Sequence, residues 1–68
     1  MTKEMDFYIY LIEHYAFYKK ISAKKVLKTL DKLNLTDYIY NMYEMYHKEA
    51  IENAYDDIDR IIEEKMNK

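Results

Sequence analysis

Apolar residues recur along this chain at the spacing of a helix rather than that of a strand. Residues three or four apart share one face of an α-helix, whereas alternate residues share one face of a strand. Sustained alternation is absent, and six apolar or small residues recur at helical spacing near the start: Met5, Tyr8, Ile9, Ile12, Tyr15 and Ala16. Charged residues fall on the other side of that helix. The pattern predicts a first helix over about residues 3–19.

A second helix is predicted to begin near Ala23. Ser22 suits the N-cap because its hydroxyl can accept from a backbone N–H two or three residues later, and Ile21 and Val26 stand at the positions of a hydrophobic staple. Asn34 marks the end, since Asn tolerates the left-handed conformation that closes many helices. The apolar stripe of this helix has four members: Val26, Leu27, Leu30 and Leu33.

A third helix is predicted to follow directly. Thr36 is its expected N-cap, and Asp37 would stand favourably against the positive end of the helix dipole. Leu35 is expected to fold back on Leu30 across the end of the second helix. The third helix would carry four apolar residues on one face: Ile39, Met42, Tyr43 and Tyr46.

Beyond Tyr46 two interpretations are open. One helix could run from Asp37 to about Met66, because apolar residues continue at helical spacing without an obvious breaker. Alternatively, Asn53 could cap a separate fourth helix whose first turn carries acids. We favour the second interpretation. The expected fold is all-α, a compact bundle of three to four short helices formed by residues 1–68 as a single domain.

Size and composition set further limits. A chain of 68 residues without cysteine has a thin stability margin and often depends on a partner or on oligomerisation. The absence of cysteine favours a reducing compartment, the apolar runs are too short to span a bilayer, and the N-terminus lacks signal-peptide features. We therefore expect a cytoplasmic protein with no membrane association. The nine tyrosines fit an interface, where Tyr is a favoured anchor, but an AT-rich genome would produce the same excess.

Charge is unevenly distributed. Residues 37–68 carry nine acids against four basic residues, whereas the second helix presents an outward row of lysines: Lys24, Lys25, Lys28 and Lys32. Such a row could contact nucleic-acid phosphates, and short helices could form a helix-turn-helix. However, the expected recognition helix has no Arg or Lys before Lys48, and the net charge is −2. DNA binding is therefore kept as an alternative.

No catalytic constellation is recognisable. Neither His14 nor His47 has metal-ligand spacing, and His47, one turn from Tyr43, is expected to be a hydrogen-bonded structural residue. Asp56, Asp57 and Asp59 splay around a helix and are interpreted as solvated rather than as a cation site. A nucleophile with its base is absent, as is a glycine-rich phosphate loop. We expect no enzymatic activity, no metal and no cofactor.

The chain resembles a family of small, uncharacterised bacterial all-α domains over residues 5–64. That family has an I-S-x-x-x-V helix start, a Y-D-x-L-H-T-x-G segment and then D-D-I, and His47 and Asp56 stand at its separation. The matching residues are Ile21, Ser22, Val26, Leu30, Asp37, Tyr38, Tyr43, His47, Asp56, Asp57 and Ile58. The chain departs from the family at Glu44-Met45-Tyr46, and at Lys48-Glu49-Ala50 in place of T-x-G. Members are similar to partners encoded beside ADP-ribosyltransferase-like toxins, so the resemblance implies an antitoxin-like role.

These observations together lead us to expect a module that binds and neutralises a partner protein, a toxin encoded nearby. An acidic C-terminal half would complement a basic cleft on that partner. The alternatives are a small helix-turn-helix DNA-binding regulator using the lysine row, or a self-associating structural module forming a homo-oligomer. The expected contact residues are Tyr38, Tyr43, Tyr46, His47, Asp56 and Asp57.

Overall fold

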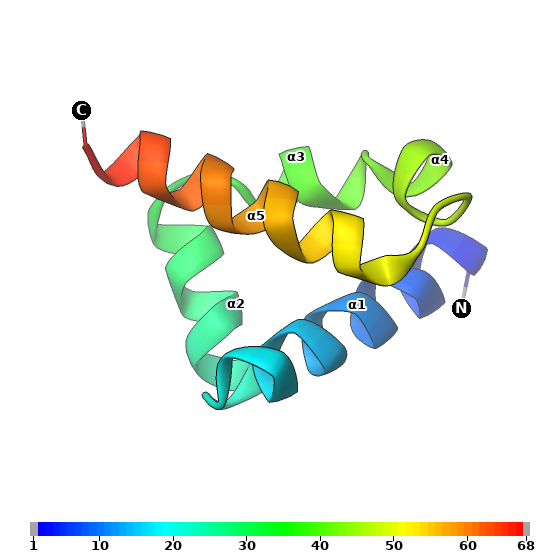
Figure 1. Ribbon diagram of the computed structural model, residues 1–68, viewed down its shortest axis with the longest axis horizontal. Coiled ribbons are helices and arrows are strands. Elements are labelled where there is room, and N and C mark those ends of the chain that lie inside the picture. Colours follow the sequence, from blue (N-terminus) through cyan, green and yellow to red (C-terminus); the bar gives the residue numbers. More distant parts are fainter. Residues whose placement is uncertain (1, 68) are drawn as a thin grey trace.

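The computed structural model describes residues 2–67, which form five helices and no strand (Figure 1). The all-α prediction is confirmed, with five helices where three to four were expected. Three of them have ten or more residues. The helices are α1 (Lys3–Lys19), α2 (Ala23–Lys32), α3 (Thr36–Tyr40), α4 (Tyr43–Tyr46) and α5 (Ile51–Met66).

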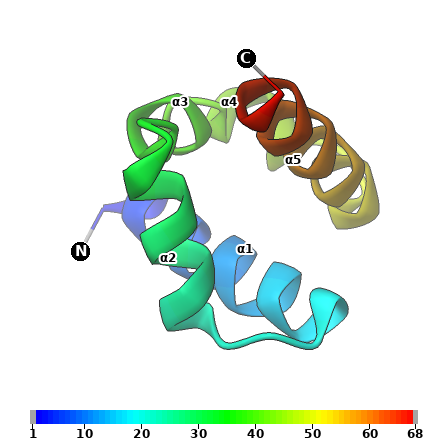
Figure 2. The same cartoon turned by 90° about the vertical axis from the view of Figure 1, so that its left-hand side faces the viewer.

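The three longer helices make the frame of the molecule. Figure 2 shows α2 and α5 on opposite sides, with α1 below them and the short helices α3 and α4 above. In Figure 1, α5 runs in the same general direction as α1, and the two helices separate toward their C-terminal ends. This divergence leaves a cleft between them, described below.

Local capping chemistry explains the first two helices. The Thr2 and Ser22 hydroxyls each accept a 3.1 Å hydrogen bond from the backbone N–H three residues later, which confirms Ser22 as an N-cap. Asn34 is left-handed, with φ 59°, and the Leu35 N–H donates to the Leu30 carbonyl at 2.7 Å. The predicted end of the second helix is therefore confirmed. Lys20, with φ 61°, closes α1 in the same left-handed conformation.

Two predicted caps are wrong. Thr36 is the first residue of α3 rather than its cap, and Leu35 occupies the N-cap position without a side-chain hydrogen bond. Asn53 lies within the first turn of α5, and Ala50, in an extended conformation, stands at the N-cap position. In both places the packing of a neighbouring apolar residue, Leu35 or Ile51, fixes where the helix begins.

The single helix over residues 37–66 is also wrong. Such a helix would be about 45 Å long at 1.5 Å per residue, longer than the 32 Å maximum extent of the molecule. It could not return its C-terminal half to the core. Instead the chain turns between α3 and α4 and again over residues 47–50, which brings Ile39, Tyr46 and Ile58 into one core.

The core takes residues from every helix. Its largest fully buried side chains are Leu11, Ile12, Val26, Leu30, Ile39 and Ile58. Among residues 2–67 every buried side chain belongs to a hydrophobic residue, counting tyrosine as one. Within the same range, no helix has the length and apolar character to cross a membrane.

Candidate functional site

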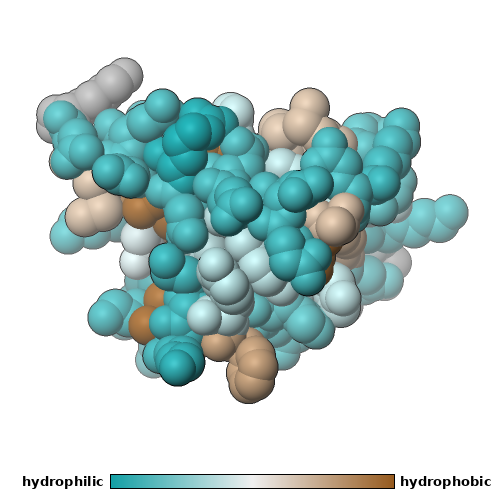
Figure 3. Space-filling view, in the orientation of Figure 1, coloured by the Kyte–Doolittle hydropathy of each residue, from teal (hydrophilic) through white to brown (hydrophobic). Residues whose placement is uncertain are grey.

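Helix α1 has a second apolar face, directed away from the core. Tyr10, His14 and Phe17 recur at spacings of four and three residues opposite the buried side of the helix, and Tyr18 lies between that side and α5. We call these four residues the aromatic face. Tyr10, Phe17 and Tyr18 are 47%, 85% and 53% exposed. Figure 3 shows pale and tan surface gathered over and below α1. Aromatic residues outside the core-facing stripe of a helix are often covered by a neighbour, yet this chain leaves Tyr10, Phe17 and Tyr18 exposed.

Ring stacking holds the aromatic face in place. The rings of Tyr10 and His14 lie 4.0 Å apart between centroids, and those of Tyr18 and Tyr55 of α5 lie 4.9 Å apart and nearly parallel. Nδ1 of His14 is 2.8 Å from the Tyr10 carbonyl oxygen, so Nδ1 carries the hydrogen that it donates. These contacts restrict the side-chain rotamers before any partner arrives.

The aromatic row continues from α1 to α4. Phe7 meets Tyr43 edge to face at 5.6 Å and also lies 6.3 Å from Tyr10. Tyr43 in turn stacks on His47 at 4.2 Å with an interplanar angle of 2°. Nδ1 of His47 donates to the Tyr43 carbonyl at 2.6 Å, which confirms His47 as a hydrogen-bonded residue. Two expected contact residues, Tyr43 and His47, thus adjoin the aromatic face.

The other expected contact residues lie elsewhere. Tyr46 is only 3% exposed and therefore belongs to the core, which corrects its assignment to a contact surface. Its hydroxyl donates to Asp57 Oδ2 at 2.5 Å, and Arg60 binds the other oxygen of Asp57 at 2.5 Å. Tyr38, 49% exposed, lies with Arg60 on the far flank of α5, and Asp56 is exposed on α5. The six residues do not form one surface.

The hydrogen bonds to Asp57 change its acidity. Burial acts to raise the pKa of Asp57, but hydrogen bonds from Tyr46 and Arg60 outweigh burial and hold the pKa below its ordinary value. Burial, reinforced by the Asp57 carboxylate, raises the pKa of the Tyr46 phenol. The phenol therefore remains a donor and the carboxylate an acceptor at neutral pH.

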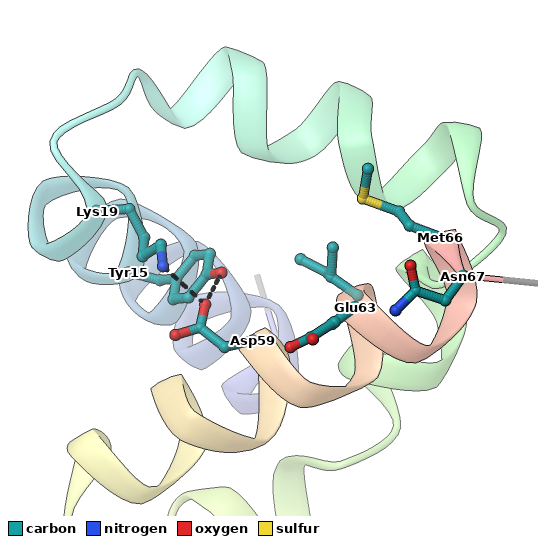
Figure 4. A pocket seen from close by; sticks show the side chains of 7 residues that line it. Tyr15, Lys19, Asp59, Glu63, Met66 and Asn67 are labelled. Atoms are coloured by element: carbon teal, nitrogen blue, oxygen red, sulfur yellow. Dashed lines mark hydrogen bonds and ion pairs between the residues drawn. The ribbon is translucent and has the colours of Figure 1, made fainter.

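A cleft of about 490 Å³ lies between the diverging ends of α1 and α5 (Figure 4). Asp59 accepts a 2.5 Å hydrogen bond from the Tyr15 hydroxyl and forms a 3.2 Å ion pair with Lys19. Burial, and next the Asp59 carboxylate, raise the pKa of Tyr15, so its phenol stays protonated. Lys19 of α1 and Asp59 of α5 are thus paired with each other across the cleft. The cleft is lined by Tyr15, Lys19, Asp59, Ile62, Glu63, Met66 and Asn67.

The lysine row of α2 is exposed as expected. Its four members, Lys24, Lys25, Lys28 and Lys32, form no ion pair within residues 2–67. The helix expected to enter a DNA groove, α3, has only five residues. In the described part of the chain, no group of three or more His, Asp or Glu side chains could hold a metal ion.

The aromatic face was not predicted from the sequence. The apolar residues of α1 were assigned to a single core-facing stripe, and no role was assigned to Tyr10, Phe17 and Tyr18. A signal was present, because a second set of aromatic residues recurs at helical spacing half a turn from the first. A helix with two such stripes predicts two covering partners.

The comparisons with known proteins place this surface within a family. A family model described as "Protein of unknown function (DUF3791)" matches residues 6–65, which include the aromatic face and nearly all of α5. Neither the search of curated proteins nor that of solved structures gives a match.

Proposed function

This chain belongs to the DUF3791 family of unknown function, and we propose that it is a non-catalytic module that binds a partner protein through the aromatic face of α1. The observation that carries the proposal is the exposure of Tyr10 and Phe17 on the side of α1 opposite the core, and of Tyr18 on the flank beside them. Contiguous apolar patches of this kind on small proteins mark interaction sites.

The side chains of this face suit an interface. Phe and Tyr each bury roughly 150–250 Å² when covered, and tyrosine is among the residues most often found at binding hot spots. Because Tyr10 already stacks on His14 and Tyr18 on Tyr55, little rotamer freedom remains to be lost on binding. Preorganisation of this kind favours tight association over a modest area.

The partner is proposed to be a toxin that the module neutralises. This finer statement rests on the resemblance over residues 5–64 to antitoxin-like partners of ADP-ribosyltransferase-like toxins. It agrees with the chemistry of the surface, because an inhibitor acts by occupying its target and needs no nucleophile or general base of its own. The paired state of Lys19, Tyr15 and Asp59 in the cleft fits the same role.

Affinity capture tests the proposal. The tagged protein, incubated with nuclease-treated lysate of its source, should retain one stoichiometric protein. The double variant Tyr10→Ser/Phe17→Ser should lose it, whereas the matched variant Tyr38→Ser/Met45→Ser, whose residues are 49% and 55% exposed, should retain it. Circular dichroism controls for folding. Equal recovery by all three proteins would refute the role of the aromatic face.

A growth assay tests neutralisation separately. The captured protein, expressed alone, should arrest growth, and co-expression of the wild-type chain should restore it. Co-expression of Tyr10→Ser/Phe17→Ser should fail to restore growth, while Tyr38→Ser/Met45→Ser should restore it. If the captured protein does not arrest growth when it is expressed alone, the chain would be a binding module whose partner is not a toxin.

DNA binding is a second candidate, favoured by the exposed lysine row of α2. Because α3 is too short to serve as a recognition helix, such binding would rest on phosphate contacts and would weaken steeply with salt. A gel-shift with the upstream region at physiological salt tests it. Retardation lost on changing Lys24, Lys25, Lys28 and Lys32 to Gln would favour a regulator, and no retardation would exclude it.

A further inference from the structure

A shallow hollow on the aromatic face combines an acid with aromatic rings. It has a volume of about 410 Å³ and is lined by Glu13, His14 and Phe17. Glu13 is exposed and forms no ion pair within residues 2–67. No lysine or arginine lines the hollow. A free carboxylate beside an 85%-exposed phenyl ring offers both charge and a π face to one incoming group.

One further acid, Glu52, adjoins the same face on the α5 side. Glu52 is exposed and is not ion-paired within the described residues. Glu52 stands one helical turn before Tyr55, whose ring stacks on Tyr18, so Glu52 adjoins the aromatic face. The rings are therefore bordered by negative charge from two helices.

We propose that the hollow at Glu13, His14 and Phe17 receives an arginine side chain from an apolar, basic segment of the partner protein. A guanidinium group stacks on aromatic rings and binds a carboxylate with two parallel hydrogen bonds, so it fits both features of the hollow. Tyr10 and Tyr18 contact the apolar residues on either side of that arginine. This inference rests on the proposed function and specifies the chemistry of its partner.

A second copy of the chain fits the face less well. Two copies that met through α1 would bring Glu13 and Glu52 of each copy into one interface. Like charges brought together in this way oppose association. The net charge of −2 acts in the same direction, whereas a basic partner would be attracted by that net charge.

Paired peptides test the proposal directly. One probe is a short amidated helical peptide with a central arginine between leucines, and the other carries citrulline in place of arginine, which keeps the shape and removes the charge. We expect the arginine peptide to shift the ring resonances of His14 and Phe17, and the citrulline peptide to bind about tenfold more weakly. Shifts that avoid these rings, or equal affinity of the two peptides, would overturn the proposal.

Variants of the chain supply the second arm. Glu13→Gln should reduce the affinity for the arginine peptide to that for the citrulline peptide, and Phe17→Ser should weaken both. Glu4→Gln, a change at an exposed acid of the same helix, should leave both affinities unchanged. Loss of affinity in Glu4→Gln equal to that in Glu13→Gln would show only general charge attraction and would overturn the assignment of the hollow.

The outcomes separate this inference from the proposed function. If the cellular partner is retained by Glu13→Gln and lost by Tyr10→Ser/Phe17→Ser, the module binds as proposed but the arginine assignment is wrong. If retention of the partner is insensitive to the aromatic face, the proposed function itself fails. Concentration-dependent dimerisation that Phe17→Ser abolishes would identify a second copy as the occupant and would overturn the arginine assignment.

Discussion

Tyrosine side chains occupy three environments in this molecule. Tyr15 and Tyr46 are buried and donate to the carboxylates of Asp59 and Asp57, which lie nearer the surface. Tyr8 is also buried, which raises its pKa, and although the Thr36 side chain lies near enough to its hydroxyl to act against that rise, the hydroxyl makes no hydrogen bond within residues 2–67. Tyr10 and others present their rings outward. The number of tyrosines in the sequence could not distinguish these environments, because the environment of each ring depends on which residues of other helices lie beside it.

The two kinds of buried phenol predict opposite effects of removing the hydroxyl. Tyr46→Phe leaves Asp57 without one donor and should lower the free energy of unfolding by about 1–2 kcal/mol. Tyr8→Phe removes a buried group that lacks a partner and should leave the free energy unchanged or raise it by up to about 1 kcal/mol. Urea denaturation of the two variants beside the wild type measures both. Equal destabilisation would contradict the difference in hydrogen bonding.

The lowered pKa of Asp57 predicts a specific acid sensitivity. A carboxylate with a folded-state pKa below its unfolded value of about 3.9 stabilises the fold above that pH, and this contribution is lost as the pH falls through the folded-state pKa. The free energy of unfolding of the wild type should therefore decrease below about pH 4. Asp57→Asn should show a smaller decrease, while Asp56→Asn, at an exposed neighbour, should parallel the wild type. Parallel curves for all three proteins would contradict the assignment.

At the scale of elements, local chemistry predicted the first two helices, and tertiary packing decided the rest. Ser22 and Asn34 act within a few residues of themselves, so the sequence sufficed to place them. Thr36 and Asn53 have equally suitable side chains but were not used as caps. The turns that separate α3, α4 and α5 are set by the return of Ile58 to the core, a long-range contact that no local pattern encodes.

The left-handed end of α1 gives a prediction for a single backbone position. A residue other than glycine costs roughly 1–2 kcal/mol in this conformation, of which glycine recovers part despite its greater unfolded-state entropy. Lys20→Gly should therefore raise the free energy of unfolding by about 0.5–1 kcal/mol. Lys28→Gly, a change at an exposed residue in the interior of α2, is the matched control and should lower it by about 1 kcal/mol. Thermal and urea unfolding check both signs, and a loss of stability in Lys20→Gly would contradict the cap geometry.

The candidate site also could be anticipated only in part. Tyr43 and His47 were expected at a contact surface and do adjoin the aromatic face through Phe7. Tyr46 was indistinguishable from them by type and spacing, yet its ring is buried, because the turn after α4 directs α5 over it. The outward stripe of α1 could have been predicted from the sequence, but only by asking which element covers each apolar residue of the helix.

At the scale of the whole molecule, a small core is combined with a large exposed apolar surface. Domains of this size bury only about 60% of the surface of the unfolded chain, so the free energy of unfolding should lie near the low end of the usual 5–15 kcal/mol. Binding of a partner to the native state alone adds to that stability by mass action. The aromatic face thus links the fold of the module to the presence of its partner.

Because of this linkage, the captured partner should restore the stability of a variant whose core has been weakened. Ile58→Ala removes a fully buried side chain and should cost about 2–5 kcal/mol, enough to unfold a measurable fraction of the isolated chain. The partner at about one hundred times its Kd should restore roughly 2.7 kcal/mol. Hydrogen exchange of α5 amides would report both changes.

In the combination of Ile58→Ala with Tyr10→Ser/Phe17→Ser, protection should not return when the partner is added, because the surface that binds the partner is missing. Full recovery in that combination would mean that the partner holds the fold through another surface, and the aromatic face would then need a different occupant.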